Sequence, residues 1–131
     1  MFDAGALVAY LDNEAGGEVV KQIIEDGDRP LYAHAMNLIE VFYHYAREVD
    51  VLKGREALET LVADGIERRE DLDTAFCEDA GNLKAQWKRV SLADCCGVAL
   101  ARRLGGEFLT TDRHELTALQ ADNVTSITFI R

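Results

Sequence analysis

The sequence predicts an α/β fold with a mostly parallel sheet, in one domain over residues 1–131. Short apolar runs alternate along the chain with longer segments of helical periodicity, an order typical of parallel sheets covered by helices. The 131 residues contain no linker, internal repeat or low-complexity segment that would divide them. With 48% hydrophobic and 29% charged residues, the composition fits one soluble globular domain.

Five apolar runs are the candidate strands, and seven periodic segments are the candidate helices. The expected strands are residues 1–2, 31–33, 66–68, 108–110 and 127–130. The expected helices are residues 6–11, 18–25, 38–49, 55–63, 72–90, 92–104 and 113–119. In the third helix, apolar residues recur every three or four positions and predict a core face: Leu38, Val41, Phe42 and Tyr45. Asn37, Glu40 and His44 fall on the opposite side.

The helix over 92–104 carries small residues on one stripe, among them Gly97 and Ala101, and these permit close approach to a sheet. Gly105 and Gly106 then end this helix, as glycines commonly do.

The charge balance limits the classes of function. Fourteen basic and 24 acidic residues give a net charge of −10, which argues against tight, non-specific nucleic-acid binding because such affinity comes mostly from basic side chains. An enzyme acting on nucleic acid stays open, since bound divalent cations reverse the sign of an acidic site. No apolar run reaches the ~18 residues of a membrane span and no signal peptide is evident, so we expect a cytoplasmic protein.

Cysteines and histidines indicate no metal site. Cys77, Cys95 and Cys96 have neither zinc-ligand nor C-x-x-C spacing, and we expect three buried, reduced thiols. The three histidines, His34, His44 and His114, lack the spacing of known ligand motifs, and we expect them on the surface or at helix ends.

Four acids stand at the junctions between predicted elements. Asp3 and Asp112 follow strands, and Glu40 and Asp94 open helices. In a parallel α/β sheet these junctions meet at one edge, where ligands collect. Hard cations such as Mg²⁺ and Mn²⁺ prefer carboxylate oxygens and water as ligands, so the four acids are a candidate metal site.

Helix capping explains the same four positions without a metal. Asp3 and Asp112 suit the N-cap position, while Asn37-x-x-Glu40, Ser91-x-x-Asp94 and Asp112-x-x-Glu115 read as capping boxes that stabilise a helix start by ~1 kcal/mol each. Spacing alone leaves both interpretations open.

Taken in order, these residues resemble the PIN domain family, and most closely the VapC-like ribonuclease toxins, over nearly the whole chain. The family's aspartate after the first strand is similar to Asp3 in FDAGALVAYL, and its N-L-x-E-V element to NLIEV with Glu40. Its L-x-D element resembles SLADCCGVALARRLG with Asp94, and its T-x-D element resembles FLTTDRHEL with Thr110 and Asp112.

The resemblance implies a five-stranded parallel sheet sandwiched by helices, with one or two Mg²⁺ or Mn²⁺ ions held by Asp3, Glu40, Asp94 and Asp112. It also implies hydrolysis of RNA phosphodiester bonds, a homodimer and a cognate antitoxin. The chain departs from the pattern in two places. Only two residues precede Asp3, and Ala4-Gly5 replaces a Ser or Thr that often follows the first aspartate.

The hypothesis for the mechanism is hydrolysis by metal-activated water. Thr110 or Thr111 is expected to orient Asp112 by hydrogen bonding. Arg113 is the leading candidate for a phosphate contact, with a solvated arginine as the equal alternative. Glu115 is left out of the expected ligand set because its position suits a reciprocal cap.

Two other functions compete with the nuclease. One is a catalytically inactive PIN-like interaction module, whose partner interface would bury aromatic residues such as Phe42, Tyr43, Tyr45 or Trp87. The other is a small phosphohydrolase of the haloacid-dehalogenase pattern, which needs a second aspartate where this chain has Gly5. Retention of all four acids favours the nuclease.

Overall fold

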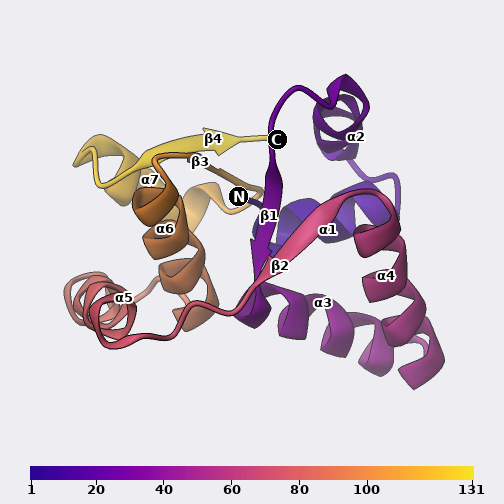
Figure 1. The fold of residues 1–131 in the computed structure, drawn as a ribbon, viewed down its shortest axis with the longest axis horizontal. Helices are drawn as coiled ribbons and strands as arrows, with labels where there is room; N and C mark the ends of the chain where they lie inside the picture. Colours follow the sequence, from indigo (N-terminus) through magenta and orange to yellow (C-terminus); the bar gives the residue numbers. More distant parts are fainter.

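The computed structural model describes all residues from Met1 to Arg131 and shows an α/β fold (Figure 1). The elements follow in the order α1 (Ala4–Leu11), α2 (Gly17–Asp26), β1 (Leu31–His34), α3 (Ala35–Glu48), α4 (Val51–Ala63), β2 (Ile66–Arg69), α5 (Thr74–Gln86), α6 (Leu92–Leu104), β3 (Glu107–Thr110), α7 (Arg113–Ala121) and β4 (Ser126–Phe129). The predicted alternation of strands and helices is therefore confirmed. None of the helices is both long and apolar enough to cross a membrane.

The sheet consists of two parallel strand pairs rather than five continuous strands. β1 pairs with β2, with Leu31 opposite Ile66, and β3 pairs with β4, with Phe108 opposite Ile127. The N-terminal segment lies between the pairs and bonds to both: the Phe2 N–H donates to the Tyr32 carbonyl at 3.0 Å, and the Asp3 N–H donates to the Leu109 carbonyl at 3.0 Å. Its only ladder contact is the parallel bridge from Phe2 to Leu109. The expected first strand is thus a two-residue segment, too short for a regular strand.

Helices cover both sides of this sheet. Figure 1 shows α5, α6 and α7 on one side of the strands and α1 to α4 on the other. Buried apolar residues form two corresponding groups, one around Leu100, Phe108 and Leu116 and one around Phe2, Leu7 and Val41. The small residues of α6 have the predicted effect, because a Cβ atom at Gly97 would lie 2.3 Å from the Phe108 ring.

Several sequence-based expectations need correction. The helix expected over 72–90 is shorter, since α5 spans Thr74–Gln86 and is followed by a loop before α6. Cys95 and Cys96 are buried as expected, but Cys77 is exposed on α5. His34 is at a helix end yet fully buried, stacked on the Phe76 ring at 5.1 Å.

The capping box predicted at Asn37 is also wrong. Helix α3 begins two residues earlier, and its N-cap is His34, whose Nδ1 accepts a hydrogen bond from the Met36 N–H at 3.2 Å. Asn37 is therefore inside the first turn and is fully buried instead of lying on an outer face. Neither its amide nitrogen nor its amide oxygen has a hydrogen-bond partner within the protein.

Candidate metal centre

Asp3 combines a capping role with almost complete burial. Its Oδ1 accepts a hydrogen bond from the Ala6 N–H at 2.6 Å and so caps α1, while its Oδ2 accepts one from the Thr110 hydroxyl. Only 3% of Asp3 is exposed. Burial raises the pKa of Asp3 to about 6, against the effect of these hydrogen bonds, and the charge of Asp112 adds to the rise.

Asp94 lies in the first turn of α6, and it is the most strongly perturbed acid of the group. The Ser91 hydroxyl oxygen caps this helix by accepting a hydrogen bond from the Asp94 N–H at 3.0 Å. Burial raises the pKa of Asp94 to about 7, and the charges of Asp3, Glu40 and Asp112 contribute to the rise. The carboxyl group therefore shares one electrostatic environment with three acids from other parts of the chain.

Glu40 lies on α3 and is half-buried. Burial is again the main cause that raises its pKa, followed by the charges of Asp3 and Glu115. The charges of Asp3 and Glu115 thus act on Glu40, but its carboxylate does not belong to the close group formed by Asp94, Asp112 and Glu115.

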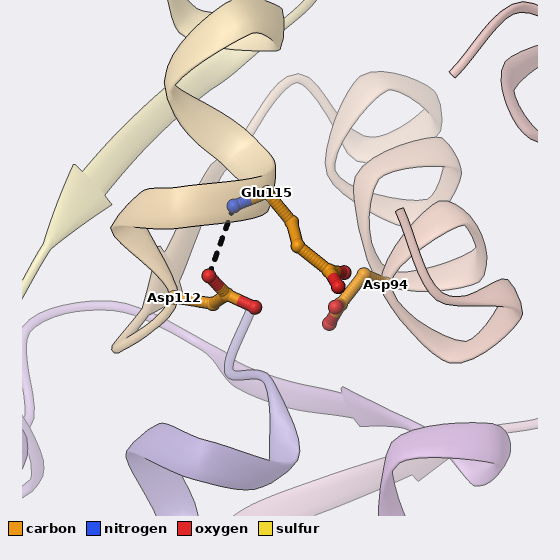
Figure 2. A group of neighbouring side chains, drawn as sticks. All are labelled: Asp94, Asp112 and Glu115. Atoms are coloured by element: carbon orange, nitrogen blue, oxygen red, sulfur yellow. Dashed lines mark hydrogen bonds between the residues drawn. The ribbon is translucent and has the colours of Figure 1, made fainter. Parts of the chain in front are cut away.

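Asp112 is both a helix cap and a member of an acidic cluster. Its Oδ1 accepts a hydrogen bond from the Glu115 N–H at 3.0 Å and caps α7, and its own N–H donates to the Thr110 hydroxyl at 2.9 Å. Figure 2 shows its carboxylate beside those of Asp94 and Glu115. One carboxylate oxygen from each of these three residues lies within 4.8 Å of the others. Asp112 can therefore cap α7 with one carboxylate oxygen and still offer the other oxygen to a metal ion.

Thr110 connects the two aspartates that follow strands. Its side chain is fully buried, donates its hydroxyl proton to Asp3 and accepts the Asp112 N–H. Because one hydroxyl holds both neighbours, Thr110 fixes the Asp3 carboxylate relative to the start of α7.

No basic side chain neutralises these acids. Asp3, Glu40, Asp94, Asp112 and Glu115 are absent from every ion pair in the structure, whereas acids elsewhere, such as Asp71 and Asp73, pair with arginines. Crowded carboxylates without cations repel one another. The donor set therefore fits a divalent cation with a preference for oxygen ligands.

Gly5 leaves room for a hydroxyl group at the edge of the cluster. A Cβ atom at Gly5 would lie 2.2 Å from the Thr111 Oγ1 and 3.6 Å from the Asp3 Oδ1. The side chain of Thr111 therefore occupies the space next to Asp3 that a larger residue 5 would take. Where the family pattern often has a Ser or Thr, this chain has Ala4-Gly5, and the hydroxyl group next to Asp3 comes from Thr111 instead.

Arg113, the residue expected to contact phosphate, makes two contacts within the protein. The Arg113 guanidinium lies over the Phe129 ring, 4.9 Å from its centroid, and its Nε donates to the Arg131 carbonyl at 2.6 Å. Among the aromatic residues considered for an interface, Tyr45 is buried and bonds to Asp12, Phe42 and Trp87 are half-buried, and Tyr43 is exposed.

Glu115 is the member of the cluster that sequence reasoning set aside. Its spacing from Asp112 suits a reciprocal cap, but the structure shows only the Asp112 half of the box: the Glu115 side chain turns toward Asp94 instead (Figure 2). The sequence signal for this role was present, because residue 115 is one turn into the helix that starts at Asp112.

Fold and site together define an α/β protein that gathers unpaired carboxylates where its strands end. The sequence model of the PIN domain matches residues 1–120, and the chain belongs to the PIN domain family. Among solved structures, it is similar to a chain of a toxin-antitoxin complex from Klebsiella pneumoniae, with a TM-score of 0.68 and 18% sequence identity. That likeness covers 99% of this chain and 96% of the other. No curated protein matches the sequence.

Proposed function

We propose that this protein is a divalent-metal-dependent endoribonuclease that hydrolyses RNA phosphodiester bonds. The observation that carries the proposal is the cluster of Asp94, Asp112 and Glu115, whose oxygens lie within 4.8 Å of one another with no basic partner. Its support from relatives is the PIN domain match, since PIN domains are generally nucleases.

Asp94, Asp112 and Glu115 would hold the first Mg²⁺ or Mn²⁺ ion, and Asp3 and Glu40 would complete the acidic environment or hold a second. When bound, such an ion lowers the pKa of a bound water and stabilises negative charge on the reacting oxygens. The chain itself offers no activated Ser or Cys nucleophile at this site.

The protein's own residues fix the geometry of the acids. The Thr110 hydroxyl holds Asp3, and the Glu115 N–H holds one oxygen of Asp112. The second oxygen of Asp112 is left for a ligand. Burial of Asp3 and Asp94 keeps bulk water from screening the site, which strengthens its electrostatic interactions with substrate and ion.

We further propose that the protein is the toxin of a type II toxin-antitoxin pair and forms a homodimer. The toxin proposal is supported by the similarity to a toxin-antitoxin complex, together with an exposed apolar groove between α3, α4 and β2. The homodimer rests on the family resemblance alone. Leu38, Phe42 and Ile66 line this groove, of about 580 Å³, and Ile39 and Val62 are more than half exposed at its sides. Exposed apolar patches of this kind mark protein interfaces, and we assign the groove to the antitoxin.

The test of the proposed function is RNA cleavage after removal and return of metal. EDTA is expected to abolish cleavage by the wild-type protein, and Mg²⁺ or Mn²⁺ to restore it. Asp94→Asn should reduce cleavage roughly 100-fold or more, because even residues that only orient metal ligands change activity by 10–100-fold. Persistence of full cleavage in EDTA would contradict the metal mechanism, and absence of cleavage with either ion would favour the inactive interaction module.

A further inference from the structure

Beside the acidic cluster lies a groove of opposite character, formed by the loop between α5 and α6 and by the start of α7. It encloses about 310 Å³ and is lined by Trp87, Lys88, Arg89, His114 and Glu115 among others. Glu115 belongs to both sites, so the groove opens directly beside the candidate metal centre.

The basic residues of this groove are unusual in a chain of net charge −10. Nine of the fourteen Lys and Arg residues form ion pairs with acids, which leaves five without an acidic partner: Arg55, Lys84, Lys88, Arg89 and Arg113. Four of these five lie in α5, in the loop after it or at the first residue of α7. Of these, Lys88 and Arg89 line the groove that shares Glu115 with the acidic centre.

Lys88 and Arg89 are the free charges within the groove. Both residues are exposed, and neither side chain makes a hydrogen bond in the protein. Lys84 is occupied, because its Nζ donates to the Lys88 carbonyl at 2.9 Å and to the Val90 carbonyl at 2.7 Å. These two hydrogen bonds hold the backbone of the loop that carries Lys88 and Arg89.

Trp87 adds an aromatic surface next to these cations. The residue is half-buried, packs against the core around α6 and also lines the groove. Its indole N–H has no acceptor in the protein, so packing alone holds the ring. An aromatic ring flanked by two unpaired cations is a common arrangement for binding single-stranded nucleic acid, through base stacking and phosphate contacts.

Resting on the proposed nuclease function, we propose that this groove binds the single-stranded RNA substrate next to the cleaved bond. Lys88 and Arg89 contact phosphates, and Trp87 contacts a base. The groove, of about 310 Å³, is at the lower end of the ~300–1,000 Å³ of small-molecule sites, which suits one unpaired nucleotide.

The first test compares two double variants with the same change in charge. Lys88→Gln/Arg89→Gln removes the groove cations, and Lys53→Gln/Arg55→Gln removes two exposed cations of α4 as the control. Binding of a single-stranded RNA oligonucleotide is measured by fluorescence anisotropy over a range of salt concentrations, in an Asp112→Asn background that prevents cleavage. Each lost phosphate contact lowers the magnitude of the slope of log affinity against log salt concentration by about 0.7. The slope of the groove variant should therefore be about 1.4 smaller in magnitude than that of the parent protein, and the slope of the control should be unchanged.

The emission of Trp87, the single tryptophan of the chain, gives an independent readout. RNA should change this emission in the parent protein and in the control variant, and much less in the groove variant. If both variants had the same RNA affinity, the same salt slope and the same change in emission, the proposal would be overturned. The same result is expected if the groove binds a protein segment instead of RNA.

A second substrate separates failure of this inference from failure of the proposed function. Bis(p-nitrophenyl) phosphate has no second phosphate and no base, so its metal-dependent hydrolysis requires only the acidic centre. With Asp112 intact, Lys88→Gln/Arg89→Gln should keep this hydrolysis while its kcat/KM for RNA falls. Unchanged kinetics on RNA would reject the groove and leave the nuclease standing, whereas absence of hydrolysis of both substrates by the wild-type protein would reject the nuclease itself.

Discussion

Asp3 and Asp94 are the two carboxyl groups whose protonation the fold changes most among the acids of the centre. Burial raises both pKa values, to about 6 and about 7 respectively. An acid with a raised pKa binds its proton more tightly in the folded protein than in the unfolded chain. These two groups therefore favour the metal-free fold when they are protonated and oppose it when they are charged.

This linkage predicts the pH dependence of stability without metal. The unfolded chain releases these protons near pH 4, and the folded protein holds them to about pH 6 and 7, so the free energy of unfolding should fall as pH rises through this interval. The expected loss is on the order of a few kcal/mol, measured by urea unfolding in EDTA. Asp94→Asn should flatten the curve, and an equally steep curve in that variant would contradict the assignment to Asp94.

Gly5 and Thr111 allow a second test at the scale of single residues. Gly5→Ala places a Cβ atom 2.2 Å from the Thr111 Oγ1, and the resulting displacement should lower the free energy of unfolding by roughly 1–3 kcal/mol. The double variant Gly5→Ala/Thr111→Ala removes the obstructing hydroxyl. We expect it to be more stable than Gly5→Ala alone, and additive effects of the two substitutions in denaturant unfolding would show that these side chains do not meet.

At the scale of elements, α6 positions Asp94 by packing closely on β3. Gly97 lies one turn after Asp94, and a Cβ atom there would lie 2.3 Å from the buried Phe108 ring. The absence of a side chain at residue 97 therefore sets the distance between helix and strand, and with it the position of Asp94.

The close packing of α6 on β3 can be tested by comparing the stability effects of two glycine substitutions. Gly97→Ala should destabilise the protein by roughly 1–3 kcal/mol through overpacking. Gly81→Ala is the matched control on α5, where a new Cβ atom would meet nothing within 4 Å, and it should stabilise the helix by about 0.5–1 kcal/mol. Thermal unfolding of the two variants should thus shift in opposite directions, and an unchanged or raised melting temperature for Gly97→Ala would mean that the packing of α6 does not depend on Gly97.

Strong local patterns made the elements predictable from the sequence, and tertiary contacts explain where prediction failed. The helix over 92–104 was expected in full because a serine cap precedes it and glycines follow it. The predicted start of helix α3 was too late because histidine is not among the strongly preferred N-cap residues. In the structure His34 is buried, stacks on Phe76 and accepts the Met36 N–H. Burial of Asn37 against α6 likewise could not be inferred from its place in the sequence.

At the scale of the whole molecule, the acids of distant segments meet because the termini of their helices converge. Asp94 and Asp112 belong to the close group of three carboxylates, whereas Asp3 and Glu40, expected at the same junctions, lie outside that group. Metal binding by these four acids stays a prediction. Glu115 was set aside because a one-dimensional pattern cannot show whether a glutamate turns back to its cap or outward to a neighbouring helix. The site thus draws on α1, α3, α6 and α7, and its acids carry charge that the fold does not balance.

These uncompensated negative charges are the main reason to expect that the protein binds a divalent cation. The most direct measurement is the melting temperature of metal-free protein during titration with Mn²⁺, for the wild type and for Asp112→Asn. Asparagine caps a helix about as well as aspartate, so the variant should keep its fold and, without metal, melt at the same or a higher temperature. A ligand that binds only the folded state adds about 2.7 kcal/mol at a concentration of 100 Kd, which corresponds to roughly 10 °C for a domain of this size. We expect such a rise for the wild type and little or none for Asp112→Asn; equal rises in both proteins, or no rise in the wild type, would contradict metal binding at this site.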